Sequence, residues 1–105
     1  MNAQSVSLSQ KIMVIVRDRL NALSSQSFEQ VAKLPPEGSE NLIVEGTTLS
    51  LSVWHDTLNS QEHRVVVQLY KPGTLSVGRM YLDGFVVNAK DEQRALTLEE
   101  WAPFS

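Results

Sequence analysis

The chain contains no cysteine, few aromatic residues and no cluster of basic side chains. Without cysteine it forms no disulfide and offers no thiolate zinc site or cysteine nucleophile, an absence compatible with a reducing cytoplasm. The net charge is −3, and the nine Lys and Arg residues are scattered between Lys11 and Arg94. A nucleic-acid backbone or an anionic membrane needs several basic groups on one surface. We therefore expect neither as a partner.

Long apolar runs are also missing. The apolar run near the N-terminus, at residues 12–16, is only five residues long. A signal peptide needs a longer apolar stretch, and a membrane span needs about 20 apolar residues. We therefore expect a soluble, cytoplasmic protein. With 105 residues, of which 42% are hydrophobic, residues 1–105 are predicted to form a single α+β domain around one core.

Established catalytic and cofactor-binding motifs are absent as well. The sequence has no Gly-x-x-x-x-Gly-Lys or Gly-x-Gly-x-x-Gly phosphate loop, no Gly-x-Ser-x-Gly elbow and no His-Glu-x-x-His. We therefore expect no cofactor and no metal, and we favour a non-enzymatic role.

Two helices are predicted in the first third of the chain. Ser7 and Gln10 stand at capping-box spacing, and an apolar stripe at helical spacing continues from Leu8 to about Leu23. The same capping spacing recurs at residues 27 and 30 and predicts a short second helix through residue 33. Because a proline disfavours helical geometry in the residue before it, the helix ends there. Residues 35–40 are then predicted to form a loop.

Residues 49–88 show the alternation of half-buried β-strands. Apolar side chains occupy every second position in two stretches, namely Leu49, Leu51 and Val53, then Val65, Val67 and Leu69. Together with the helices, these strands predict an α+β fold in which an N-terminal helix pair packs on one face of a four- to five-stranded antiparallel meander sheet. Residues 42–44 begin the β region. Gly46 either turns the chain in a tight hairpin or bulges one long strand.

The apolar positions also restrict the register of the first long hairpin. Both apolar sets are odd-numbered, and side chains on one face pair only with the same face of the next strand, so paired residue numbers add to an even sum. Two registers with three-residue loops remain. One sets Asp56 against Glu62, a destabilising like-charge pair, whereas the other sets Asp56 against Arg64 and Trp54 against Val66. We predict the second register.

Two later turns are predicted from proline and glycine. The first is at Pro72 and Gly73. The second is at Asp83 and Gly84, because Asp-Gly suits the positive φ angles of a type I′ hairpin. The two turns imply opposite parities for the residues between them, so a bulge near Gly78 is predicted to reconcile them.

His55 and His63 are the only histidines, and the predicted register makes them diagonal neighbours on one sheet face. Two imidazoles near acidic residues suggest a metal site or an acid–base pair. Their spacing matches no established ligand motif, so we favour a structural role. The alternative is a small-ligand-binding or hydrolytic domain, with a pocket between helix and curved sheet near the two histidines.

The other sheet face is the candidate interaction surface. It carries serine and glutamine between larger side chains, and the predicted binding residues are Trp54, Arg64, Val66, Tyr70 and Tyr81. Trp, Tyr and Arg are enriched at the centres of protein interfaces. The alternative is a solvated face with cross-strand aromatic pairs. We predict a small protein-interaction module that forms a homo-oligomer or binds a protein partner through this face.

The last ten residues are rich in large apolar side chains, namely Leu96, Leu98, Trp101 and Phe104. A free tail of this composition would expose a large apolar surface. Residues 97 and 100 have capping-box spacing and predict a helical turn that directs Trp101 back to the domain. We expect the tail to dock on the domain's own sheet edge rather than on a partner.

Overall fold

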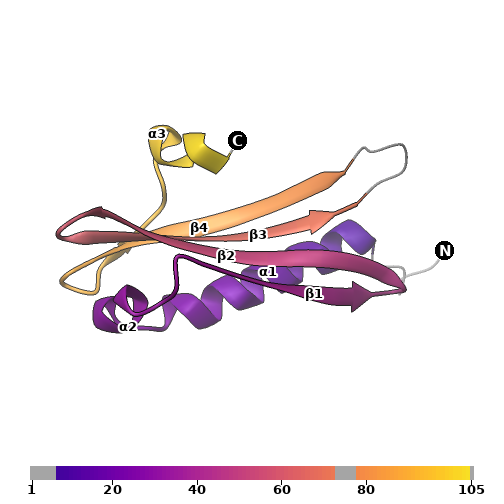
Figure 1. Cartoon of the computed structure of the whole chain (residues 1–105), viewed down its shortest axis with the longest axis horizontal. Helices are drawn as coiled ribbons and strands as arrows, with labels where there is room; N and C mark the ends of the chain where they lie inside the picture. Colours follow the sequence, from indigo (N-terminus) through magenta and orange to yellow (C-terminus); the bar gives the residue numbers. More distant parts are fainter. Residues whose placement is uncertain (1–6, 73–77, 105) are drawn as a thin grey trace.

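The computed structural model describes residues 7–72 and 78–104. Two N-terminal helices lie on one side of an antiparallel sheet, and a short C-terminal helical segment lies on the other side (Figure 1). The elements are α1 (Leu8–Ser24), α2 (Phe28–Ala32), β1 (Glu37–Val44), β2 (Thr47–Asn59), β3 (Glu62–Lys71), β4 (Arg79–Asn88), β5 (Gln93–Arg94), α3 (Leu98–Trp101) and the 3₁₀ turn η2 (Ala102–Phe104). The strand order is β1-β2-β3-β4-β5. The predicted fold, a helix pair on an antiparallel meander, is confirmed.

Both N-terminal helices begin at the predicted capping boxes. The Ser7 hydroxyl accepts a hydrogen bond from the Gln10 backbone N–H at 3.1 Å, and the Gln10 side chain accepts one from the Ser7 backbone N–H at 3.2 Å. The same pair of bonds opens α2. The apolar stripe of α1 packs on the sheet, where Ile12 and Val16 are buried, and α2 buries Val31. The local capping signals therefore place both helix starts correctly.

A tight two-residue turn joins β1 to β2 and decides the alternative at Gly46. Glu45 and Gly46 have φ angles of 51° and 79°, both positive as a type I′ turn requires. Val44 pairs directly with Thr47 across this turn. The loop predicted at residues 35–40 is wrong from Glu37 onward, because β1 already begins there. Pairing with β2 along the whole of β1 overrides the polar composition of that stretch.

The predicted register of β2 and β3 is confirmed, with Asp56 opposite Arg64. The loop of this hairpin is shorter than the three residues predicted. A bulge between Thr57 and Asn59 shifts the register, which leaves residues 60–61 to form the turn. The bulge absorbs the extra residue at the hairpin end without changing the pairing of the core positions.

The hairpin predicted at Asp83 and Gly84 is wrong, because both residues lie inside β4. β4 pairs with β3 over its whole length without a register shift, so the bulge predicted near Gly78 is not needed. Gly84 has a packing role instead, since a Cβ there would lie 2.5 Å from the backbone carbonyl oxygen of Val65. Close approach of two strands, not a turn, requires this glycine. The turn predicted at residues 72–73 falls partly outside the described residues.

The continuous β4 strand changes which side chains share a face. Odd-numbered residues of β3 pair with odd-numbered residues of β4, and both sets face α1 and α2. We call this side the helix face and the opposite side the outer face. Tyr81 was expected on the outer face, but it lies on the helix face, where its hydroxyl is 3.0 Å from the hydroxyl of Ser9. Met80 and Leu82 take the outer face in its place.

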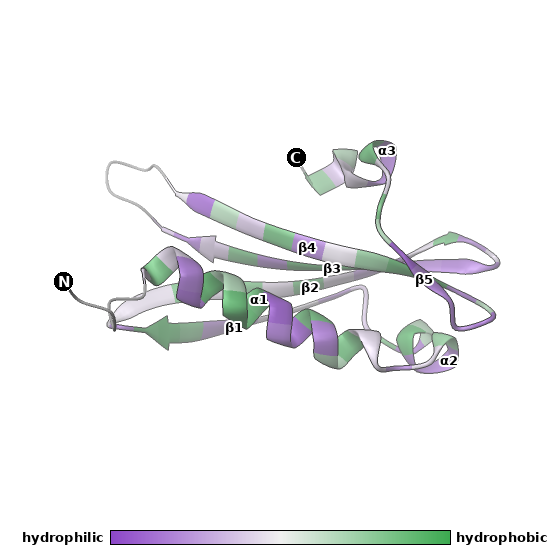
Figure 2. Ribbon diagram, turned by 180° about the vertical axis from the view of Figure 1, so that it is seen from behind, coloured by the Kyte–Doolittle hydropathy of each residue, from purple (hydrophilic) through white to green (hydrophobic). Residues whose placement is uncertain are grey.

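The C-terminal segment, residues 95–104, lies against the outer face, on the side of the sheet opposite α1 and α2 (Figures 1 and 2). Leu96 is buried against Val66, and Trp101 and Phe104 pack against the same cluster. The tail therefore docks on its own domain as expected, but on a sheet face rather than a sheet edge. Leu98 was expected to dock as well, but it is 90% exposed.

Candidate functional site

The C-terminal segment divides the outer face into a covered half and an open half. Under the segment, Val66 and Val86 have almost no exposed surface. The open half lies toward the β1–β2 turn and consists of Ile43, Thr48, Ser50, Gln68, Tyr70 and Met80. Within it, Ile43 and Met80 are 76% and 54% exposed. The open half therefore combines apolar and aromatic side chains with hydroxyl and amide groups.

Arg64 of β3 binds the C-terminal segment to the outer face of the sheet. Its guanidinium makes two hydrogen bonds to the Asp56 carboxylate, one of them from Nε at 2.8 Å, and a third from Nη1 to the Glu100 backbone carbonyl at 2.6 Å. The Phe104 ring lies over the guanidinium at 5.1 Å. The hydrogen bonds to Asp56 raise the pKa of Arg64. The guanidinium is thus committed to contacts within the chain.

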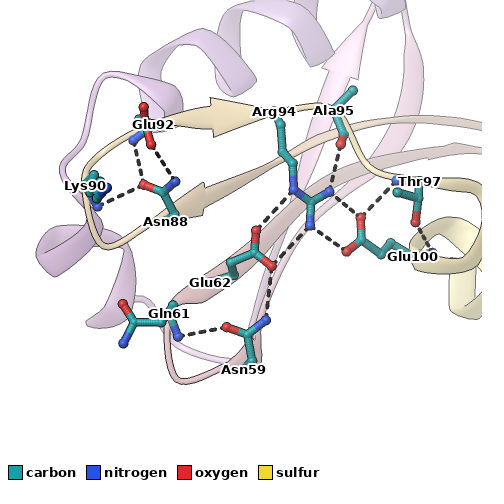
Figure 3. Close-up of polar contacts among 10 residues, drawn as sticks. All are labelled: Asn59, Gln61, Glu62, Asn88, Lys90, Glu92, Arg94, Ala95, Thr97 and Glu100. Atoms are coloured by element: carbon teal, nitrogen blue, oxygen red, sulfur yellow. Dashed lines mark hydrogen bonds and ion pairs between the residues drawn. The ribbon is translucent and has the colours of Figure 1, made fainter.

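A second arginine holds the segment at its start (Figure 3). Arg94 of β5 donates to both carboxylate oxygens of Glu100, at 2.7 and 2.8 Å, and to both carboxylate oxygens of Glu62, at 3.2 Å each. The bonds from Arg94, with those from Thr97, lower the pKa of Glu100 to about 2. Hydrogen bonds from Arg94 and Asn59 also lower the pKa of Glu62. These charge-assisted contacts fix the direction in which the segment leaves β5.

An open groove of about 580 Å³ lies between the end of the C-terminal segment and the sheet. Its lining includes Trp54, Asp56, Gln68, Met80, Pro103 and Phe104. The Trp54 indole nitrogen is buried and has no hydrogen-bond partner within the described part of the chain. Because Asp56 already pairs with Arg64, the groove offers mainly apolar walls, one amide, and the side chains of Glu37 and His55. It continues the open half rather than forming a separate pocket.

The predicted binding residues do not form one accessible surface. Trp54, Arg64, Val66 and Tyr70 lie on the outer face as expected, but Tyr81 lies on the opposite one. Val66 is fully buried and Arg64 is 8% exposed, because the chain's own C-terminal segment covers them. Trp54 packs edge-on against the ring of Phe104, with ring centroids 6.4 Å apart. Tyr70 is the member of the set that belongs to the open half.

The two histidines pair with each other on the helix face. His55 Nε2 lies 2.8 Å from His63 Nδ1, and His55 Nδ1 lies 3.0 Å from the Leu34 carbonyl oxygen. Because a carbonyl only accepts, His55 Nδ1 carries a proton, and in the neutral pair His63 Nδ1 donates to His55 Nε2. Phe28 of α2 packs edge-on against the His63 ring at 4.8 Å. Both imidazoles therefore hold α2 and the segment after it against the sheet.

This pairing predicts a pH-dependent stability. Burial, and then the neighbouring His55, lower the pKa of His63 below its usual 6.5, while Asp56 acts in the opposite direction. As the pH falls from about 6.5 toward the lower pKa of the folded state, the unfolded chain binds more protons than the folded one. The free energy of unfolding therefore decreases over this range. Urea unfolding between about pH 8 and pH 5 measures the slope. In His63→Gln most of this slope is expected to disappear, and an unchanged slope would contradict the assignment.

The described residues contain no group of three or more His, Cys, Asp or Glu side chains placed to hold a metal ion. No helix in residues 7–72 and 78–104 is long and apolar enough to cross a membrane.

Comparison with models of known protein families, with characterised proteins and with solved structures finds no match for this chain. The architecture defines the class of the protein, an α+β domain whose antiparallel sheet is covered by helices on one face and by the C-terminal segment on half of the other.

Sequence reasoning missed the Arg94 anchor. Arg94 joins Glu62 of β3 to Glu100 of the C-terminal turn. Glu100 was recognised as the second member of a capping box, which the structure contains. The ion pair of Glu100 with Arg94 depends on the short β5 strand, and a strand of two residues is too short to show the alternation from which strands are predicted.

Proposed function

We propose that this chain is a non-enzymatic protein-interaction module that self-associates. The observation that supports the proposal is the apolar surface that the two edge strands leave exposed on the outer face, where Ile43 of β1 and Met80 of β4 are 76% and 54% exposed. Exposed apolar side chains rimmed by polar groups are typical of interaction sites. The neighbouring half of the same face is already covered by the chain's own apolar segment.

The contacts described above narrow the surface that a second copy can use. Val66 and Arg64, the centre of the surface predicted from sequence, are engaged within the chain. On the sheet itself, a second copy therefore has two accessible surfaces, the open half of the outer face and the sheet edges. Both consist of β structure with exposed apolar side chains, which suits pairing between copies.

A non-enzymatic role agrees with how the polar groups are used. The imidazoles of His55 and His63 hydrogen-bond to each other and to the backbone. Two of the three charged groups that line the groove, Asp56 and Arg64, neutralise each other, and the third is the Glu37 carboxylate. Groups that are already paired in this way have little capacity to act as acid, base or nucleophile on a substrate.

The proposal is tested by sedimentation velocity and native mass spectrometry over a concentration series. We expect the weight-average mass to rise with concentration from 11.7 kDa toward twice that value. A single species of 11.7 kDa at every concentration would contradict self-association. Retention of a small molecule by the purified protein would favour the ligand-binding alternative instead.

A further inference from the structure

One edge of the sheet is unpaired over most of a long strand. β4 runs from Arg79 to Asn88, but β5 pairs only with Val86 and Val87. No strand within residues 7–72 and 78–104 pairs with the remaining part of that edge. Figures 1 and 2 both show this part of β4 as the border of the sheet, with no other strand alongside it. Its backbone N–H and C=O groups on that side are a template for another strand, except for the Gly84 N–H, which donates to the Asp83 carboxylate at 2.8 Å.

A shallow groove accompanies this free edge. It has a volume of about 290 Å³ and lies between α1 and β4, lined by Met13, Val16 and Arg17 of α1 and by residues 80–83 of β4. Met13 and Met80 are 52% and 54% exposed. An edge strand with a side pocket and a neighbouring helix is the arrangement used for strand addition, in which the backbone supplies hydrogen bonds and the pocket receives side chains.

The charges along the free edge identify the strand that fits. Arg79 and Asp83 are both exposed, both lie on the helix face and are four residues apart. If a second β4 pairs antiparallel with its Tyr81 opposite Tyr81 of the first copy, Arg79 of each copy lies opposite Asp83 of the other. The same register sets Met80 opposite Leu82 of the second copy on the outer face. Opposite charges and apolar side chains in directly opposed positions stabilise an antiparallel pair.

Neighbouring self-pairing registers lack this match. In a register centred on Met80, Arg79 would lie opposite Tyr81 of the second copy. In a register centred on Leu82, Asp83 would lie opposite Tyr81. Neither register brings the two charges together. Charged residues on an edge usually prevent pairing with other chains. Here their order along the strand, basic and then acidic, makes them complementary in one antiparallel arrangement.

The opposite edge of the sheet does not share this property. β1 is also an edge to which no further strand of the described residues pairs, but its charged residues are Glu37 and Glu40, both acidic. A second β1 strand would add two more carboxylates and no basic partner. Glu40 is also engaged by Arg19 of α1, at 2.6 Å. The charge pattern therefore favours β4 over β1 as the pairing edge.

We propose that two copies of this chain pair β4 to β4 about a two-fold axis at Tyr81, joining their sheets into one continuous sheet. This inference rests on the proposed self-association and names its interface. In this register odd-numbered residues pair with odd-numbered residues, which keeps the α1 helices of both copies on the same side of the joined sheet. Their Met13 side chains therefore flank the axis. The open halves of the two outer faces remain uncovered in this dimer.

Charge reversal with rescue tests the pairing. Arg79→Asp alone, or Asp83→Arg alone, sets like charges opposite each other at both symmetric positions and is expected to weaken the dimer roughly ten- to a hundred-fold. The double variant restores both pairs with reversed polarity and is expected to dimerise nearly as tightly as the wild type. Circular dichroism confirms that each variant is folded. The readout is the dissociation constant from sedimentation velocity at low ionic strength, where screening is weakest.

Two control variants distinguish pairing at β4 from a general effect of net charge and from association through the outer face. Lys90→Asp changes the net charge as Arg79→Asp does, but at an exposed loop position. Ser50→Arg places a bulky charge at the centre of the open half of the outer face. We expect both to dimerise like the wild type. If Ser50→Arg abolishes the dimer, or if the double variant fails to rescue, the β4 interface is overturned while self-association stands. A wild type that stays monomeric would overturn both.

Discussion

Deleting residues 101–105 is expected to lower the free energy of unfolding by about 3–5 kcal/mol, as for removal of a large aromatic side chain from a core. The deletion removes Trp101 and Phe104 from the outer-face cluster and exposes Val66 and Val86, which are now buried. It also removes the ring that lies over the Arg64 guanidinium. For a domain held together by about 5–15 kcal/mol, this is a large share of the total.

Thermal unfolding at several protein concentrations measures the effect. Because the segment docks within one chain, the drop in Tm, roughly 10 °C or more for a domain of this size, should be the same at every concentration. Leu98→Ala is the matched control, since Leu98 belongs to the same segment but is 90% exposed; its Tm should not change. A deletion that leaves Tm unchanged but dissolves the dimer would place the segment at the interface between copies instead.

Gly84→Ala is expected to destabilise the fold by about 1–3 kcal/mol, the usual cost of forcing a methyl group into a packed site. The new Cβ would lie 2.5 Å from the Val65 carbonyl oxygen, 3.1 Å from a Val66 methyl carbon and 3.3 Å from a Leu96 methyl carbon. The closest of these is backbone of the paired strand, which moves only if β3 and β4 separate. The substitution thus strains the sheet and the docking of the C-terminal segment together.

Gly38→Ala provides the comparison for this effect. Gly38 is a strand glycine in β1, and a Cβ there would meet no atom within 4 Å. The added methyl group should leave stability unchanged or raise it slightly, because alanine restricts the unfolded chain more than glycine does. Equal unfolding free energies for Gly84→Ala and Gly38→Ala in urea would refute the close-approach role of Gly84.

The helices and the first hairpin register could be predicted because their determinants are local. Capping boxes at Ser7 and Ser27 place the helix starts within a few residues of sequence. The register of β2 and β3 follows from side-chain parity together with one charge pair, Asp56 with Arg64. In both cases the information lies in neighbouring residues or in directly opposed pairs.

The boundaries of β1 and β4 could not be predicted, because they depend on pairing between strands. Glu37 and Gly38 have poor strand propensity, yet they are held by β2. Asp83 and Gly84 have the composition of a type I′ turn, but the length of β3 requires a partner strand that continues past them. Tertiary pairing overrides local propensity at both places.

The candidate surface was predicted in part for the same reasons. Parity places Trp54, Arg64, Val66 and Tyr70 on one face, as found. Tyr81 was misplaced because its parity depended on the turn assigned at Asp83 and Gly84. The chain's own tail covers Val66 and Arg64 because residues 95–104 cross the sheet at that place. The alternation of apolar residues in the sequence carries no information about this path.

The pairing of β4 with β4 is tested most directly by cysteine cross-linking, because the native chain contains no cysteine. In the proposed register Met80 lies opposite Leu82 of the second copy. Directly opposed residues have Cα atoms about 4.5–5.5 Å apart, within the range of a disulfide, whereas diagonal ones are too far apart. Oxidation of an equimolar mixture of Met80→Cys and Leu82→Cys is therefore predicted to give a disulfide-linked mixed dimer, and neither variant alone should cross-link efficiently. A mixture that forms dimers without cross-linking, or equal cross-linking by each variant alone, would contradict the account.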